Sequence, residues 1–293
     1  MKKMLFIYNP KAGKAQIRNK LADILDVFTR GGYEITIYPT QKREDAMEKT
    51  RDRSKDYDIV VCSGGDGTLD EVVTGMIRSG FRTPIGYIPA GSTNDFGGSL
   101  GLPKNMVHAA ETIVNGNDFA CDVGSFNQDI FVYIAAFGLF TDVSYETGQD
   151  MKNVLGHFGY LLEGIRDLDT LRPYSVRITA DGEKLDGDYL FGAVANSTSI
   201  AGMMKLEGEQ VVLDDGRFEL LLIPNPKNVL ELQNLIWALL NQQYDAGGLI
   251  FRHVTSLHVE TDQELPWSLD GEYEPSRPAV DITNCQRALT MLL

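Results

Sequence analysis

The chain of 293 residues has no long hydrophobic run. A membrane-spanning helix needs about 20 consecutive apolar residues, whereas the longest runs here, such as 131–140, have the length of a strand and are interrupted by glycine or proline. The apolar run after the two N-terminal lysines covers about five residues, which is too short for the core of a signal peptide. We therefore expect a cytoplasmic protein without a spanning segment.

Cysteine and histidine are also scarce. The three cysteines share no spacing typical of a metal site, and Cys62 and Cys121 lie in apolar runs, which predicts that both are core residues. The four histidines are scattered, and no two of them stand at ligand spacing. This pattern argues against a metal centre built from cysteine and histidine and against histidine catalysis.

Positive charge is in deficit: 27 lysines and arginines stand against 41 acidic residues, a formal net charge of −14. Nucleic acids require clustered cations, so they are excluded as partners. Strong attraction to anionic membranes also needs a local basic face. Lys11, Lys14, Arg18 and Lys20 form such a run, and it is either a solvated helix face or a contact for anionic headgroups.

The first part of the chain alternates strand-like and helix-like segments, which is typical of a parallel sheet with helices on both faces. Strands are expected at residues 4–8, 34–38, 58–62 and 84–88, and helices at 17–28, 44–53, 69–77 and 107–114.

After about Cys121 the pattern changes to short segments with alternating hydrophobicity, which favours a β-sandwich. We therefore predict an α/β domain over residues 1–121 and a β-sandwich domain over residues 122–293. Strands are expected at 131–135, 174–180, 189–195, 218–223, 256–260 and 279–282, with helical patches at 158–168 and 229–241. The apolar stripes of these patches either line a lipid groove or pack onto the sheet, and packing is the commoner cause.

Gly64-Gly65-Asp66-Gly67-Thr68 is the most informative segment, because an apolar strand leads into a glycine-rich turn and a helix follows at once. Ligands bind at this edge of an open parallel sheet. Glycines let backbone N–H groups approach phosphate oxygens, and a helix N-terminus adds partial positive charge. Asp66 would repel bare phosphate but could hold or orient Mg²⁺ on a nucleotide. The alternative is a tight turn without a ligand.

Two further polar, glycine-bearing loops follow strands of the same sheet. Asn9-Pro10-Lys11-Ala12-Gly13-Lys14 comes after the first strand, and residues 89–97, Pro-Ala-Gly-Ser-Thr-Asn-Asp-Phe-Gly, come after the fourth. Ser92, Thr93 and Asn94 offer donors for phosphate or ribose. Because the carboxyl ends of parallel strands meet at one edge, we expect the three loops to converge.

Two acidic turns stand in the second half. Asp214-Asp215-Gly216 is either a hard-cation site or an Asx turn, and Asp270-Gly271-Glu272 reads by itself as an ordinary hairpin turn. Asp122 follows Cys121 and by itself is equally a strand-end aspartate.

Together these motifs resemble the diacylglycerol kinase catalytic family, the soluble bacterial lipid kinases related to sphingosine kinases. The resemblance covers nearly the whole chain. GGDGT is shared more widely, including with the NAD kinases, whereas NPKAGK and PAGSTNDFG are specific to the lipid kinases. Leu155-Gly156 with Gly159-Tyr160 and the two acidic turns follow in the family's order.

The resemblance implies a phosphofructokinase-like α/β domain, a C-terminal β-sandwich and ATP in the cleft between them. It implies the following contacts with ATP: Asn9, Pro10, Lys11, Ala12, Gly13, Thr40, Gly65, Asp66, Gly67, Thr68, Leu69, Asp70, Glu71 and Ser92. Ser92 stands where the family usually has threonine, which keeps the hydroxyl. Ala12 stands where serine is frequent, so one side-chain donor is lost.

The resemblance also implies the catalytic and metal residues. Glu272 would be the base that takes the proton of the acceptor hydroxyl, acting with Asp66. A structural Mg²⁺ would bind the side chain of Asp215 and the carbonyls of Val212 and Arg217, and Asp122 would link this ion to the nucleotide-bound Mg²⁺.

The sequence thus predicts an ATP- and Mg²⁺-dependent lipid kinase that phosphorylates diacylglycerol and binds the inner face of the plasma membrane peripherally and transiently. An apolar strand edge in the second domain would also support a homodimer. The alternatives are a kinase for a sphingoid base or phosphatidylglycerol, an NAD kinase, and a lipid- or nucleotide-binding protein without turnover.

Overall fold

A computed structural model of the chain describes residues 1–139, 171–200, 204–205, 211–244 and 246–293. These residues form two compact units, Met1–Val123 with Gln286–Leu293, and Gly124–Cys285. The first boundary lies close to the one expected after residue 121. The last segment of the chain belongs to the first unit, whereas residues 122–293 were predicted to form the second domain.

The first unit is built on a parallel sheet whose strands run in the order β2, β1, β3, β4 and the end of β18. Its strands are β1 (Lys2–Tyr8), β2 (Tyr33–Pro39), β3 (Ile59–Gly64), β4 (Ile85–Pro89) and the C-terminal part of β18 (Ala279–Leu292). Every residue of β3 and β4 is buried, as expected for central strands covered on both faces.

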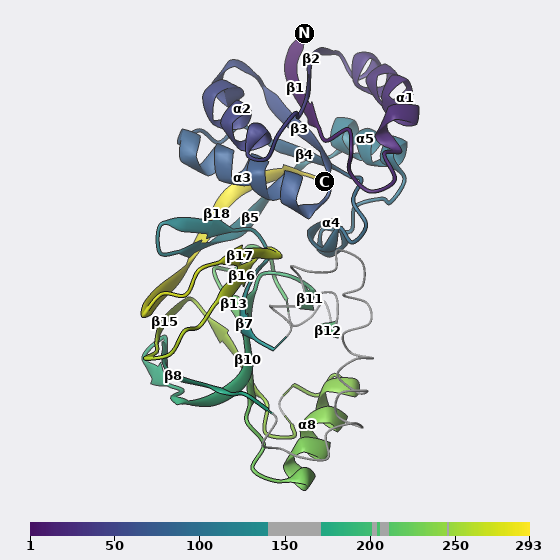
Figure 1. Cartoon of the computed structure of the whole chain (residues 1–293). Helices are drawn as coiled ribbons and strands as arrows, with labels where there is room; N and C mark the ends of the chain where they lie inside the picture. The colour runs from purple at the N-terminus through teal and green to yellow at the C-terminus, as the bar shows by residue number, and fades with distance from the viewer. Residues whose placement is uncertain (140–170, 201–203, 206–210, 245) are drawn as a thin grey trace. The chain divides into compact units, whose positions relative to one another are not determined.

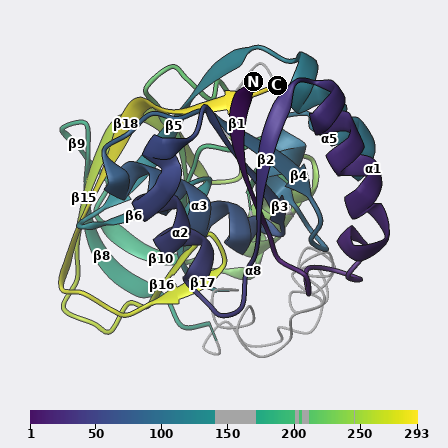
Figure 2. The ribbon, with the colours of Figure 1, turned by 90° about the horizontal axis from the view of Figure 1, so that it is seen from above.

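Helices cover both faces of this sheet, and their contacts pair α1 with α5 and α2 with α3 (Figure 2). The helices are α1 (Ile17–Arg30), α2 (Asp45–Arg53), α3 (Asp66–Ser79), α4 (Asp95–Ser99) and α5 (Met106–Asn115), with a short 3-10 turn, η1, at Ser54–Asp56. Phe6 and Phe28 meet edge to face, with ring centroids 5.7 Å apart, and anchor α1 onto β1. The helices and strands expected for this half of the chain are confirmed within a few residues at each end.

The second unit consists mainly of antiparallel strands, together with helix α8 (Figure 1). Its described elements are β5 (Asp118–Phe126), β6 (Asp129–Phe131), β7 (Ile134–Gly138), β8 (Tyr174–Ala180), β9 (Glu183–Lys184), β10 (Gly187–Ala195), β11 (Ser199–Ile200), β12 (Met204–Lys205), β13 (Phe218–Pro224), α8 (Val229–Leu240), β14 (Ile250–Val254), β15 (Ser256–Glu260), β16 (Trp267–Leu269), β17 (Glu272–Glu274) and the first part of β18. β5 begins in the first unit, and β18 ends in it.

The core of the second unit is aromatic. Trp267 is 1% exposed and packs edge to face against Phe126 and Phe137, with ring centroids 5.1 and 4.9 Å apart. Phe131 packs against Phe218. The expected fold class, an α/β unit together with a β-sandwich, is confirmed.

One expected strand is divided in two. The sequence pattern predicted a single strand over 131–135, whereas β6 ends at Phe131 and β7 begins at Ile134. The backbone N–H groups of Val132, Tyr133 and Ile134 donate to the carboxylate of Asp270. A side chain from a distant turn therefore takes the donors that a continuous strand would offer to its neighbour.

The helical patch expected at 158–168 and the motif at residues 155–160 lie outside the described residues. Among the residues that are described, no helix is both long and apolar enough to cross a membrane.

Candidate active site

Three glycine-bearing loops meet at the carboxyl edge of the sheet in the first unit. Gly13 has φ +53°, and a Cβ there would lie 2.4 Å from the carbonyl oxygen of Ala90. A Cβ on Gly91 would lie 2.5 Å from the Cα of Gly65. Real Cβ atoms do not approach other atoms so closely, so the three backbones pack together only because glycine stands at these positions. The convergence expected from the sequence is therefore seen in the structure.

Backbone hydrogen bonds hold the three loops in place. The N–H of Asn9 donates to the carbonyl of Ser63, and the N–H of Ala90 donates to the carbonyl of Gly64, both at 2.8 Å. The side chain of Asn9 accepts the N–H of Lys11 at 2.9 Å, which fixes the first loop as an Asx turn. Lys11 is exposed, as is Lys14. The backbone of the Asn9–Gly13 loop is thus held by hydrogen bonds, and the loop carries exposed positive charge.

Asn94 holds the loop after β4 rather than offering a free amide. Its Oδ1 accepts the N–H of Gly91 at 2.8 Å, and its Nδ2 donates to the carbonyl of the same residue at 2.9 Å. Ser92 and Thr93, in contrast, are exposed between them. The hydroxyls of Ser92 and Thr93 are accordingly the side-chain groups of this loop that remain suited to a ligand.

Tyr87, which was not among the predicted site residues, contacts the same loop through its hydroxyl. Its hydroxyl lies 3.1 Å from the carbonyl oxygen of Gly64 and 3.2 Å from Oδ1 of Asn94. Burial raises the pKa of Tyr87, so the hydroxyl keeps its proton and donates. Within the sequence Tyr87 looks only like another residue of a buried strand, and nothing marks its polar end.

Helix α3 starts where the three loops meet, and no side chain caps its N-terminus. Gly65 is the N-cap residue and has no side chain to cap the helix, while its carbonyl accepts the N–H groups of Thr68 and Leu69. A Cβ on Gly64 would lie 2.3 Å from Oγ1 of Thr68, so this glycine is also required by close packing. An uncapped helix N-terminus with glycine on both sides is suited to an anion such as phosphate.

Asp66, the first residue of α3, carries an unusual carboxylate. Its Oδ2 accepts the N–H of Asp95 at 3.2 Å, whereas its Oδ1 is buried without a hydrogen-bond partner among the described residues. Burial raises the pKa of Asp66, and backbone N–H groups oppose this rise only in part. A buried carboxylate oxygen without a partner is costly in the apo protein and fits a cation as its missing neighbour.

The remaining residues expected to contact ATP lie in α3 or directly after β2, and they differ in burial and in hydrogen bonding. Both carboxylate oxygens of Glu71 are bound by backbone N–H groups, of Glu44 at 2.9 Å and of Ala46 at 3.0 Å, so this side chain caps α2. The side chain of Leu69 is buried, Asp70 is half-buried, and Thr40 follows β2, where its N–H donates to the carbonyl of Tyr8 at 2.9 Å. Contacts of these residues with ATP stay predictions, and Glu71 already serves the fold.

The acidic turn before β13 is an Asx turn in the structure. Oδ1 of Asp215 accepts the N–H of Arg217 at 2.9 Å, and the N–H of Asp215 points to the carbonyl of Val212 at 3.5 Å. The three residues are therefore neighbours, and their side chains are exposed. No group of three or more acidic, histidine or cysteine side chains suited to a metal occurs in the part of the chain that the structure describes. Magnesium at this turn stays a prediction.

Asp122 is fully buried within the first unit. Its Oδ1 accepts the N–H of Arg287 at 2.7 Å, and Arg287 lies in β18 with φ +50°. This bond ties the returning C-terminal strand to β5. The carboxylate of Asp122 thus has a clear structural partner, and its predicted link to a metal is not visible in these contacts.

Glu272 opens β17 directly after a two-residue hairpin turn. Asp270 and Gly271 both have positive φ, at +51° and +87°, and Leu269 pairs with Glu272 across the turn. This is the geometry of a type I′ turn, for which Asp-Gly is a favoured pair. The side chain of Glu272 is exposed, whereas Asp270 is only 6% exposed. The sequence predicted the turn but gave no sign that Asp270 is buried.

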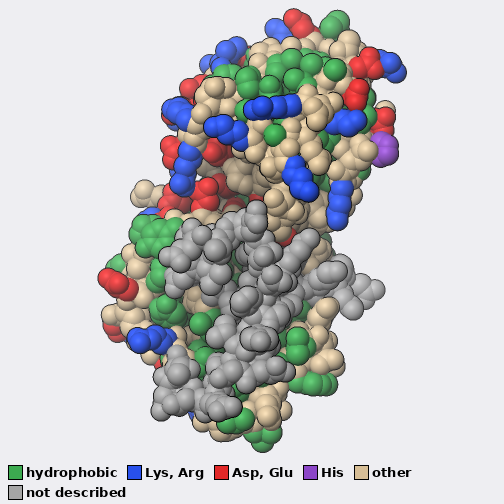
Figure 3. Space-filling model, turned by 45° about the vertical axis from the view of Figure 1, so that its right-hand side comes forward, with side chains coloured by type: hydrophobic (Ala, Val, Ile, Leu, Met, Phe, Trp, Pro, Cys, Tyr) green, Lys and Arg blue, Asp and Glu red, His purple; other side chains and the backbone are tan. Residues whose placement is uncertain are grey.

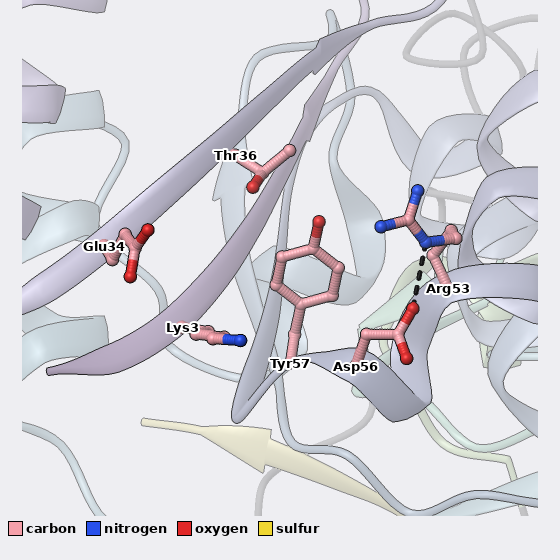
Figure 4. A pocket seen from close by; sticks show the side chains of 6 residues that line it. All are labelled: Lys3, Glu34, Thr36, Arg53, Asp56 and Tyr57. Atoms are coloured by element: carbon pink, nitrogen blue, oxygen red, sulfur yellow. Dashed lines mark hydrogen bonds and ion pairs between the residues drawn. The ribbon is translucent and has the colours of Figure 1, made fainter.

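A pocket lined by Lys3, Glu34, Thr36, Arg53, Asp56 and Tyr57 lies at the opposite end of the strands (Figure 4). Lys3 and Glu34 stand at the beginnings of β1 and β2, and Arg53 and Asp56 form an ion pair at 3.0 Å inside the pocket. Ligands of open parallel sheets bind at the carboxyl ends of the strands. This pocket is therefore separate from the three glycine loops.

Comparison with known proteins gives a consistent result. Residues 3–126 match the diacylglycerol kinase catalytic domain, and residues 136–292 match the YegS C-terminal NAD kinase beta sandwich-like domain. The chain is 35% identical to a diacylglycerol kinase of Staphylococcus carnosus over 280 residues, covering 95% of this chain and 91% of that protein. It is 34% identical to a diacylglycerol kinase of Staphylococcus aureus, covering 95% of this chain and 88% of that one.

A solved structure supports the same assignment. A putative diacylglycerol kinase from Bacillus anthracis superposes with a TM-score of 0.81 at 26% identity, covering 99% of this chain and 96% of the other. The match extends over both units. The chain therefore belongs to the diacylglycerol kinase catalytic domain family, and it is an ATP-dependent lipid kinase.

Proposed function

We propose that the chain transfers the γ-phosphate of ATP to the free hydroxyl of diacylglycerol and so forms phosphatidic acid. Curated relatives that cover 95% of the chain carry the name diacylglycerol kinase, which favours this lipid over a sphingoid base or phosphatidylglycerol. The proposal combines this name with the geometry of the three loops.

The observation that carries the proposal is the close approach of the three glycine loops beside the uncapped start of α3. A Cβ on Gly91 would clash with the Cα of Gly65, and a Cβ on Gly13 would clash with the carbonyl oxygen of Ala90. Such packing brings the three loops beside the N-terminus of α3, whose partial positive charge favours the phosphates of ATP. The exposed hydroxyl of Ser92 and the exposed charges of Lys11 and Lys14 would bind the same anion.

Magnesium fits this site, because Oδ1 of Asp66 is buried and has no hydrogen-bond partner among the described residues. When bound, Mg²⁺ would neutralise phosphate charge as it does in other phosphoryl transfer enzymes. Asp66 would hold or orient it, while the N–H of Asp95 keeps the other oxygen of Asp66 in place. The turn at Val212, Asp215 and Arg217 is our second proposed magnesium site, with Asp122 in the network that connects the two.

Glu272 is our proposed base. Phosphoryl transfer needs a group that accepts the proton of the attacking hydroxyl, and an exposed carboxylate at the end of a rigid hairpin can meet an incoming alcohol. Its neighbour Asp270 is anchored by three backbone N–H groups, which fixes the hairpin on which Glu272 stands.

Diacylglycerol resides in a bilayer, so the proposed activity requires peripheral and transient contact with the cytoplasmic face of the membrane. The net charge of −14 opposes general attraction to anionic lipid. Contact must therefore come from a local feature of the surface.

The test is transfer of label from γ-labelled ATP into a panel of acceptors in mixed micelles. The panel contains diacylglycerol, a sphingoid base, phosphatidylglycerol and, in solution, NAD. We expect label in phosphatidic acid with a preference of at least roughly tenfold over the other acceptors. Preferential label in another lipid would replace the substrate, and label in NAD alone would replace the function.

A further inference from the structure

Helix α8 has an apolar side that is exposed in the part of the second unit that the structure describes. Among the described residues, Val229, Leu230, Trp237 and Leu240 are exposed by 59, 66, 55 and 57%. The other exposed large hydrophobic residues are scattered along the chain at Met1, Ile37, Phe81, Val212 and Tyr273. One helix thus holds a concentrated apolar surface, and hydrophobic side chains reach the surface in the lowest part of Figure 3, the height at which Figure 1 shows α8.

The exposed residues share one side of the helix. Leu230, Gln233, Trp237 and Leu240 recur at spacings of three and four, while Leu232, Leu235 and Leu239 are buried on the other side. A helix that is hydrophobic on both sides either lies in a protein core or contacts lipid. Since the residues on one side of α8 are exposed, that side does not lie in a protein core, and contact with lipid is the environment that fits it.

The exposed side is also uncharged. Glu231 is the only charged residue of α8. Its carboxylate accepts the backbone N–H of Lys227 at 2.8 Å and the side-chain amide of Asn228 at 3.0 Å, while Asn228 caps the helix by accepting the N–H of Glu231 at 2.9 Å. These reciprocal hydrogen bonds hold the carboxylate of Glu231 at the N-terminal end of the helix. Leu230, Trp237 and Leu240 are left beside the polar, uncharged Gln233, Asn234 and Asn241.

The size of this surface argues against a protein partner. The helix has 12 residues and is about 18 Å long at 1.5 Å per residue. With a width of about 10 Å, its exposed side falls well below the roughly 800 Å² per partner of a stable protein interface. A bilayer sets no such minimum, because a few apolar side chains can insert between headgroups. Tryptophan in particular prefers the boundary between hydrocarbon and water.

We propose that the exposed side of α8, formed by Val229, Leu230, Trp237 and Leu240, is the surface by which this kinase inserts into a lipid bilayer. The inference rests on the proposed function, which places the substrate in a membrane. Because the side carries no charge, insertion depends on apolar contact and is insensitive to salt, unlike the binding of a basic patch to anionic lipid.

Trp237 offers a direct reporter of this contact. The chain has two tryptophans, and Trp267 is only 1% exposed. Change in tryptophan fluorescence on addition of vesicles therefore reports on Trp237. With vesicles of phosphatidylcholine and diacylglycerol, we expect a blue shift and quenching by brominated acyl chains, both retained at high salt. Vesicle binding without quenching, or loss of binding at high salt, would overturn the proposal.

A double variant, Leu230→Gln with Trp237→Gln, tests the surface by vesicle flotation. Its matched control is Phe81→Gln, since Phe81 is 47% exposed in the first unit and far from α8 in sequence. We expect at least tenfold weaker vesicle binding for the double variant and wild-type binding for the control. Equal activity of all three proteins on soluble short-chain diacylglycerol shows that each is folded. Equal binding of all three would refute the inference.

Further outcomes separate the alternatives. If the wild type self-associates and the double variant is monomeric with unchanged vesicle binding, α8 joins two copies and the proposal fails. If no protein phosphorylates diacylglycerol while Trp237 is still quenched by lipid, the proposed function fails and the bilayer contact stands. If all proteins are active on soluble substrate but none binds vesicles, the bilayer contact alone fails.

Discussion

The carboxylate of Asp270 accepts the backbone N–H of Val132, 138 residues earlier in the chain, at 2.5 Å. The N–H groups of Tyr133 and Ile134 donate to the same carboxylate at 3.0 and 2.9 Å, and the N–H of Asp270 donates back to the carbonyl of Ile134 at 2.9 Å. One buried side chain therefore fastens the hairpin that carries Glu272 to the connection between β6 and β7.

Replacing Asp270 with alanine should destabilise the protein and slow catalysis. Three buried N–H groups would lose their acceptor, at about 1–3 kcal/mol each without full additivity, so we expect a loss of roughly 3 kcal/mol in the free energy of unfolding. Urea unfolding measures this loss. Asp270→Asn is the matched control, because asparagine also tolerates positive φ and keeps one oxygen. Its loss should be smaller, and equal stability of the alanine variant and the wild type would contradict the argument.

The loop contact between Gly65 and Gly91 can be tested with alanine. In Gly91→Ala the new Cβ would lie 2.5 Å from the Cα of Gly65 and 2.8 Å from Oδ1 of Asn94, so the loop must shift. We expect the KM for ATP to rise by at least roughly tenfold, about 1.4 kcal/mol. Gly98→Ala is the matched control, since beyond its own helical turn a Cβ there meets no atom of the described residues within 4 Å. Similar kinetics of the two variants would show that the loop contact does not shape the nucleotide site.

Replacing Asp66 with asparagine should stabilise the protein but slow phosphoryl transfer. Burial raises its pKa, which means that the folded protein at neutral pH pays for keeping this carboxylate ionised. Asp66→Asn removes the charge and keeps an oxygen for the N–H of Asp95, so the melting temperature of the apo protein should rise. Phosphoryl transfer should fall by at least roughly a hundredfold. Thermal unfolding and label transfer measure the two effects. A variant that is less stable and still active would contradict both roles.

His258 makes stability depend on pH in the second unit. Its Nδ1 lies 2.6 Å from Asp281, and its Nε2 lies 3.4 Å from Glu260, which Arg177 also binds. The hydrogen bond to Asp281, followed by that to Glu260, raises the pKa of His258. A raised pKa means that the contribution to stability is fully present below about pH 6.5, the ordinary value, and is lost as the pH rises through the folded value. The effect is small because these side chains are exposed.

Urea unfolding between about pH 6 and pH 9 checks this dependence. The wild type should lose some stability over this range, and His258→Gln should lose less. Parallel curves for the two proteins would mean that the ion pairs of His258 do not form in solution.

Local patterns in the sequence were sufficient for most elements of the fold. Strand β15 was predicted at its observed bounds because its alternation of apolar and polar residues is regular, and α8 was predicted to within one residue. The return of β18 to the first unit was not predicted, because pairing of Met291 with Ile85 depends on contacts between distant parts of the chain. The expected strand end at residue 282 reflects a weaker alternation after it.

Some features of the candidate site could likewise be predicted from the sequence, and others could not. The convergence of the glycine loops followed from the topology of a parallel sheet, which the sequence pattern reveals. The roles of Tyr87, Asn94 and Glu71 could not be predicted in this way, because each depends on which backbone group the side chain contacts in the folded protein. For α8, the sequence favoured packing of its apolar stripe onto the sheet; Leu232 and Leu235 are buried, whereas Trp237 is exposed.

The most direct test of the account is the stoichiometry of the reaction in mixed micelles of diacylglycerol with ATP and Mg²⁺. ADP and phosphatidic acid should form in equal amounts with the wild type and with Gly98→Ala, and neither should form at a comparable rate with Asp66→Asn. Formation of ADP without phosphatidic acid, or full activity of the Asp66 variant, would contradict a lipid kinase whose glycine loops and Asp66 hold the nucleotide.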